Sequence, residues 1–140
     1  MALVADTGGL HALYDSDDQY HRRVRAVLER EEPPIIIPTA IVAEIDYMLR
    51  AFLGVEAELS FLEGLAIGAF TLEPFTNADL KRCQQLIRQY RKADLGLADS
   101  AVMATAERLG IDRILTVDEK HFRMVRTAKG RPYTILPADV

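Results

Sequence analysis

The sequence has very little cysteine, and it lacks both an apolar run of membrane-spanning length and a secretory signal. The 140-residue chain has one cysteine, Cys83, which excludes an internal disulfide framework. Charged residues interrupt every apolar run within a few positions, so no segment is suited to span a bilayer. The first ten residues lack the basic start and cleavage site of a signal peptide. We therefore expect a cytoplasmic protein without a membrane segment.

Histidine is scarce as well. The three histidines, His11, His21 and His121, are scattered without metal-ligand spacing, and we interpret each as a surface or packing residue. Repeats, low-complexity tracts and linkers are absent too. We therefore expect residues 1–140 to form one domain, which is long enough for a substantial core.

Charge is unevenly distributed, although the net charge is only −4. Residues 1–80 contain 5 Lys and Arg against 14 Asp and Glu, whereas residues 81–140 contain 12 against 7. One interpretation is a basic surface beside an acidic one, which would let an acidic protein hold a polyanion. The other interpretation is that the charges simply lie on two solvated helix faces. Charge alone favours this second interpretation.

Apolar strands alternate with amphipathic helices along the chain. Strands are expected at residues 2–7, 33–39, 69–75, 112–118 and 133–137. Helices are expected at residues 15–32, 40–54, 55–68, 78–93 and 96–110. Thr39 and Asn77 are the predicted caps of the second and fourth helices. Because strands that are apolar throughout belong to parallel sheets covered on both faces, the sequence predicts an α/β fold.

Four acidic residues are expected at the carboxyl edge of this sheet, where such folds bind ligands. Asp6 and Asp118 close strands, Asp99 opens a helix, and Glu44 lies in the second turn of another. Clustered carboxylates repel one another unless a cation compensates, and Mg²⁺ and Mn²⁺ prefer oxygen ligands. The sequence thus predicts a divalent-metal site, although each acid alone could be a turn residue or a cap.

Two further acids are ambiguous. Glu44 and Asp46 flank the apolar arc of their helix on opposite sides, so periodicity does not choose between them. Asp94 precedes its helix by two or three residues and is either an N-terminal cap or a residue of the metal site.

The segments that carry these acids resemble the PIN-domain ribonucleases, and among them the VapC-type toxins of prokaryotic toxin–antitoxin pairs. The matching segments, which together cover nearly the whole chain, are VADTGGL, PTAIVAEI, YRKADLGLADSAVMATAERLG and ILTVDEKHF. The resemblance implies a three-layer α/β/α sandwich with a parallel five-stranded sheet. It also implies an endoribonuclease that uses Mg²⁺ or Mn²⁺ to cleave single-stranded regions of RNA by metal-activated water.

By motif match, the resemblance assigns Asp6, Glu44, Asp99 and Asp118 to the acidic quartet and thereby favours Glu44 over Asp46. Thr7 and Thr116 match positions where the family has a hydroxyl that orients ligands or water. Gly8 and Gly9 depart from the family, which often has Ser or Asn after the threonine. The resemblance further implies a cognate antitoxin that inserts a segment near the site, and a homodimer.

Two surfaces are candidates for partners. The basic second half of the chain is expected to hold RNA phosphates, through Lys81, Arg82, Arg88, Arg91, Lys92, Lys120, Arg123, Arg126, Lys129 and Arg131. Tyr90 and Phe122 either stack on bases or pack in the core. Residues 40–68 carry excess apolar side chains, which form either a groove for a partner or a self-packed helical hairpin. These side chains are Met48, Phe52, Leu53, Leu59, Phe61, Leu62 and Leu65.

Three other functions compete with the nuclease. A receiver-like phosphotransfer domain needs paired acids at the first strand, which VADTGG lacks. A haloacid-dehalogenase-like phosphatase needs a second aspartate two residues after Asp6, where Gly8 stands. A catalytically inactive domain that binds RNA or protein would have no need for all four acids.

Overall fold

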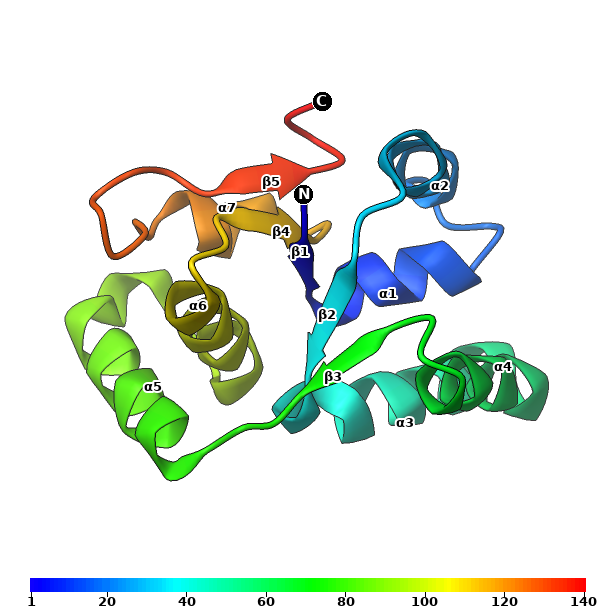
Figure 1. Cartoon of the computed structure of the whole chain (residues 1–140), viewed down its shortest axis with the longest axis horizontal. Helices are drawn as coiled ribbons and strands as arrows, with labels where there is room; N and C mark the ends of the chain where they lie inside the picture. Colours follow the sequence, from blue (N-terminus) through cyan, green and yellow to red (C-terminus); the bar gives the residue numbers. More distant parts are fainter.

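Five short parallel strands form one sheet in the computed structural model, which describes residues 1–140 (Figure 1). The strands are β1 (Leu3–Ala5), β2 (Ile35–Pro38), β3 (Thr71–Glu73), β4 (Arg113–Leu115) and β5 (Thr134–Leu136). Their order across the sheet is β3-β2-β1-β4-β5, and every neighbouring pair is parallel. All five predicted strands are confirmed, each shorter than expected.

Helices cover both faces of this sheet. They are α1 (Thr7–Tyr14), α2 (His21–Glu31), α3 (Val42–Leu53), α4 (Val55–Ala66), α5 (Asn77–Gln89), α6 (Leu97–Leu109) and α7 (Glu119–Arg123). Two 3₁₀ turns, η1 (Thr39–Ile41) and η2 (Arg91–Ala93), precede α3 and follow α5. In Figure 1, α1 to α4 lie on one side of the sheet and α5 and α6 on the other. The predicted three-layer α/β/α sandwich is thus confirmed.

The strand order places a topological switch beside β1. The chain runs outward from β1 to β2 and β3 and then returns on the other face to β4, which pairs with the free side of β1. In such sheets the connections diverge at the switch point and leave a crevice at the carboxyl ends of the strands. The ends of β1 and β4 are therefore the expected position of a ligand site.

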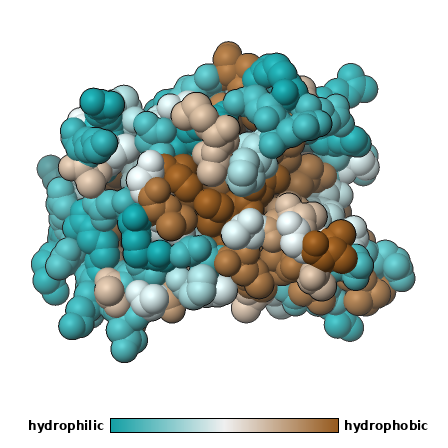
Figure 2. Space-filling view, viewed as in Figure 1, coloured by the Kyte–Doolittle hydropathy of each residue, from teal (hydrophilic) through white to brown (hydrophobic).

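The core consists of the central strands and the small side chains of α6. Leu3, Val4 and Ala5 of β1 are fully buried, as are Ile114 and Leu115 of β4. Residues 100–106 of α6 are all buried, and this alanine-rich helix contacts β1 and β2. Figure 2 shows a hydrophobic band across one face of the molecule, between hydrophilic regions.

Gly8 and Gly9 have a packing role that explains why no side chain follows Thr7. A Cβ atom on Gly9 would lie 2.4 Å from the carbonyl oxygen of Leu115 in β4. A Cβ atom on Gly8 would lie 2.9 Å from a methyl group of Val117. The first turn of α1 therefore lies directly against the end of β4, which brings the carboxyl ends of β1 and β4 together.

Several local predictions were wrong. Helix α1 was not predicted at all, and neither was the five-residue α7. Thr76, not Asn77, caps α5, because its hydroxyl accepts from the Asp79 N–H while the Asp79 carboxylate accepts from the Thr76 N–H. Thr39 does not cap α3; its hydroxyl accepts from the Phe75 N–H beside β3.

None of the helices has the length and hydropathy that crossing a membrane requires.

Candidate metal centre

Asp6 lies at the carboxyl end of β1 and is the residue before α1. Its side chain is only 5% exposed, and Oδ2 accepts a hydrogen bond of 2.8 Å from the Thr116 hydroxyl. Burial, together with the charges of Asp99 and Asp118, raises the pKa of Asp6 to about 6 despite the hydrogen bonds from Thr116 and Thr7. The chain therefore holds this carboxylate where its charge is unfavourable.

Thr116 links two of the acids. Its hydroxyl donates to Asp6 and accepts from the backbone N–H of Asp118 at 3.0 Å. Both of its hydrogen-bonding functions are thus used to fix the end of β4 against Asp6. Thr7, the other predicted hydroxyl, is buried and its Oγ1 has no hydrogen-bond partner.

Asp99, Asp118 and His121 form a compact group beside Asp6. Each offers one ligand atom, and the three atoms lie within 4.8 Å of one another. Asp118 caps α7 by accepting from the His121 N–H at 3.3 Å, and His121 Nδ1 hydrogen-bonds to Asp118 Oδ2. The same nitrogen lies 3.8 Å from Asp99 Oδ2. The dipole of α6 favours a negative charge at Asp99, in its first turn.

The ionisation of these groups is linked. Burial raises the pKa of Asp99, and the charges of Asp118 and Glu44 raise it further, whereas His121 lowers it. The hydrogen bond to Asp118 raises the pKa of His121, as does the charge of Asp99. Asp6 and Asp99 therefore each carry a pKa raised in part by other predicted acids, and a cation is the natural compensation.

Glu44 is the outermost of the four. It is exposed, and it lies in the first turn of α3 rather than the second, because η1 takes up the preceding residues. Asp46 does not share this environment: it interacts with Glu58 of α4 and raises the pKa of that carboxyl. Of the two acids that periodicity left open, only Glu44 acts on Asp99.

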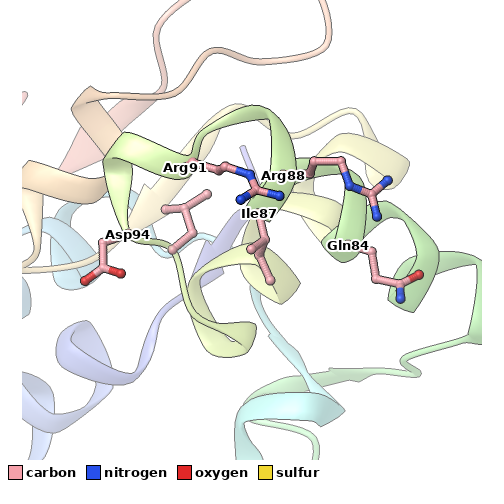
Figure 3. A pocket seen from close by; sticks show the side chains of 6 residues that line it. Gln84, Ile87, Arg88, Arg91 and Asp94 are labelled. Carbon is pink, nitrogen blue, oxygen red and sulfur yellow. The ribbon is translucent and has the colours of Figure 1, made fainter.

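Asp94 is not the cap of α6. It is exposed, has a left-handed backbone (φ 54°) after η2, and the residue that precedes α6 is Gly96. It lies in a surface hollow with Arg88 and Arg91 (Figure 3). Of the two interpretations of Asp94, the helix cap is therefore wrong.

His121 was missed as a member of the site. The sequence interpretation treated it as a packing residue because no second histidine stands at metal-ligand spacing. The available signal was its position three residues after Asp118, where the first turn of a helix brings the two side chains together.

The site fits a hard divalent cation. Its donors are mainly carboxylate oxygens, which Mg²⁺ and Mn²⁺ prefer, and their charges are uncompensated except at His121. The buried hydroxyl of Thr7, next to Asp6, makes no hydrogen bond within the chain and is free to bind a ligand. Fold and acidic centre together define a doubly wound α/β protein with a candidate divalent-metal site.

Comparison with known proteins identifies the family. The PIN-domain family matches residues 3–127, and the chain therefore belongs to this family. It is 30% identical over 135 residues to Ribonuclease VapC26 of Mycobacterium tuberculosis, covering 96% of this chain and 100% of that protein. The VapC-type resemblance in the sequence is confirmed.

Solved structures share the fold. The sarcin-ricin loop cleaving toxin VapC20 of Mycobacterium tuberculosis superposes with a TM-score of 0.79 at 15% identity, covering 86% of this chain and 92% of that one. A toxin–antitoxin complex from Klebsiella pneumoniae superposes with a TM-score of 0.68 at 21% identity, covering 86% and 90%.

Proposed function

We propose that this chain is a divalent-metal-dependent endoribonuclease and the toxin of a type II toxin–antitoxin pair. Its PIN family, its likeness to a protein named as a VapC ribonuclease, and its acidic centre support this function. The proposal takes residues 1–140 as a single PIN domain that acts on RNA in the cytoplasm. The observation that carries it is the group of Asp99, Asp118 and His121, with the buried Asp6 affected by the charges of both acids and Asp99 affected by the charge of Glu44.

Asp6, Glu44, Asp99 and Asp118 are the proposed metal ligands and catalytic residues, and Mg²⁺ or Mn²⁺ the proposed ion. A bound ion of this kind polarises a phosphoryl oxygen and lowers the pKa of a water that attacks phosphorus. Thr116 positions Asp6 through its hydroxyl, and His121 positions Asp118. The low exposure of Asp6 keeps water from competing for its carboxylate.

Removal of the metal tests this function. We expect the purified chain to cleave a structured RNA with an exposed single-stranded loop in Mg²⁺, and EDTA to reduce the rate to background. Mn²⁺ added after chelation should restore the cuts at the same positions. Asp99→Asn, which removes one proposed ligand, should give no cuts in either ion. Cleavage that persists in EDTA contradicts the proposal.

The exposed face of α3 and α4 is the proposed contact with a second copy and with a cognate antitoxin. Of the apolar side chains predicted there, Phe61 is buried between Tyr14 and Phe70. The two helices pack together, so the hairpin interpretation holds for part of the set. Others stay exposed, including Phe52 at 70% and Leu59 at 52%. Large exposed apolar patches mark interaction sites.

A charge on this face tests the dimer. We expect light scattering to give twice the chain mass for the parent protein and a single chain mass for Phe52→Glu. Because Phe52 is exposed, the free energy of unfolding of the variant should lie within about 0.5 kcal/mol of that of the parent chain. The proposed dimer is refuted if the parent protein is monomeric at high micromolar concentration.

A further inference from the structure

The cations of the second half of the chain differ in whether an acid holds them. Four arginines are bound to acids: Arg82 to Glu107 at 2.6 Å, Arg108 to Asp79 and Glu73, Arg113 to Glu31, and Arg123 to Asp139 and Glu119. Arg82 and Arg123 were predicted to hold substrate, but these ion pairs occupy their guanidinium groups. They are therefore structural cations, which leaves fewer positions to meet a polyanion.

Arg88, Arg91 and Lys92 are close together in the chain and are not held in this way. All three are exposed, and none has an acidic partner within ion-pair distance. Arg88 and Arg91 together line two adjoining hollows of about 400 Å³ each, and Lys92 lines the second. We call these two hollows the basic groove. Figure 3 shows the Arg88 and Arg91 side chains near Ile87, with the Asp94 carboxylate pointing away from both.

The basic groove is lined at its two ends by residues that lie next in the chain to the elements of the acidic centre. Its first hollow ends at Asp94 and Leu95, immediately before α6, whose first turn holds Asp99. Its second hollow reaches Met124 at the end of α7, which begins directly after Asp118. The segment that leads into α6 and the residue that follows α7 thus line the groove.

We propose that the basic groove binds the RNA strand next to the phosphate that is cleaved, with Arg88, Arg91 and Lys92 on successive phosphates. This inference rests on the proposed nuclease function. Ile87 and Leu95 supply an apolar floor for ribose or base, and the half-buried ring of Tyr90 lies in the adjoining hollow. Asp94 repels phosphate at the end near α6, which places the contacts toward Arg88.

Helix stability alone does not explain why residues 88, 91 and 92 are basic. Arg88 lies in the last turn of α5, where a positive charge offsets the helix dipole. Arg91 and Lys92 lie beyond the last turn of that helix, in η2, and make no ion pair there. An acidic peptide would be held by the same charges. RNA is the better fit because a strand with its phosphate at the acidic centre passes along the bordering groove.

The test compares two triple variants that remove the same charge. One is Arg88→Gln, Arg91→Gln and Lys92→Gln in the groove. The control is Lys81→Gln, Lys129→Gln and Arg131→Gln, cations that also lack ion pairs but lie outside the groove. The sequence alone included these three among the expected phosphate contacts, and the groove proposal excludes them. Binding of a fluorescent 20-nucleotide single-stranded RNA is measured by anisotropy in EDTA, so that no strand is cut, from 50 to 200 mM salt.

We expect the groove variant to bind at least about tenfold more weakly at 100 mM salt. Its salt slope should fall by about 2, the value for three phosphates on a single strand. The control should bind almost as the parent does, and both variants should retain the parent's Mn²⁺ affinity.

An equal loss of RNA affinity in the two variants, or no loss in the groove variant, would overturn the proposal that the basic groove binds RNA. The proposal would also be overturned if the groove variant still bound RNA as the parent does but no longer bound the antitoxin. Failure of the parent protein to cleave RNA in Mg²⁺ instead refutes the nuclease function, and that assay is separate from binding.

Discussion

Asp6→Asn should abolish RNA cleavage and at the same time stabilise the metal-free protein. Loss of a ligand at the metal centre should lower the rate by at least about 100-fold, since even residues behind the ligands are worth 10–100-fold. The pKa of Asp6 is about 6 when folded, against 3.8 in the absence of the fold. At pH 7.5 its ionised form therefore costs about 2–3 kcal/mol of folding free energy, which asparagine removes.

The gain in stability expected for Asp6→Asn depends on pH. Because the folded pKa is raised, the native state holds the proton between pH 4 and 6 while the unfolded state has lost it, so the stability of the parent protein relative to the variant falls as pH rises. Urea unfolding in EDTA should thus show a large gain for the variant at pH 7.5 and almost none at pH 4. Asn retains an oxygen that accepts from Thr116, and Asp6 makes no side-chain cap to lose.

Asp112→Asn is the matched control, because this exposed carboxylate makes no side-chain hydrogen bond in the structure. It should leave both the cleavage rate and the free energy of unfolding near those of the parent. Cleavage at the parental rate by Asp6→Asn would remove this residue from the catalytic site. A loss of stability at pH 7.5 would show that its charge is compensated within the chain.

Gly9→Ala should be the most destabilising single-methyl change in the molecule. The new methyl would lie 2.4 Å from the carbonyl oxygen of Leu115, a backbone atom that cannot rotate away. Overpacking a core costs about 1–3 kcal/mol, and occasionally more where the backbone must shift. We expect the upper end, about 3 kcal/mol, because relief requires separating α1 from β4. Chemical denaturation at pH 7.5 measures it directly.

Gly96→Ala is the control for this substitution. A Cβ atom there meets nothing within 4 Å, and the backbone φ of −93° suits alanine. Its free energy of unfolding should change by less than about 1 kcal/mol. If Gly9→Ala were as stable as the control, the close approach of α1 to β4 would be wrong, and with it the distance between the strand ends that carry Asp6 and Thr116.

The fold was largely predictable from the sequence, because its central strands β1 and β4 are short apolar runs whose residues are all buried. Three consecutive isoleucines between prolines indicated β2, and an alanine-rich segment that ends at Gly110 indicated α6. Helix α1 was missed because TGGLHALY contains two glycines, which have poor helix propensity. Tertiary contact of Gly9 with β4 outweighs that propensity, and such a contact is invisible in the sequence.

The acidic site was predictable in part. Strand ends and helix starts placed Asp6, Glu44 and Asp99 near one edge because parallel strands share their carboxyl edge. Asp118 lies three residues beyond β4, as the cap of α7, rather than closing the strand. The role of His121 depends on that short helix.

Ion pairing on the surface was not predictable. Arg82 and Glu107 lie 25 residues apart in the sequence, and only the packing of α5 on α6 brings them together. The same packing decides which cations stay free. Phe122, weighed as a base-stacking residue, is fully buried and packs edge-on against Tyr133.

Anomalous diffraction from a crystal soaked in Mn²⁺ tests the central claim most directly. We predict a peak at coordination distance, about 2.1 Å, from carboxylate oxygens of Asp6, Asp99 or Asp118, and its loss in Asp99→Asn. A peak only at the separate group of His11, Asp15 and Asp18, or no peak on the protein at all, would contradict the account.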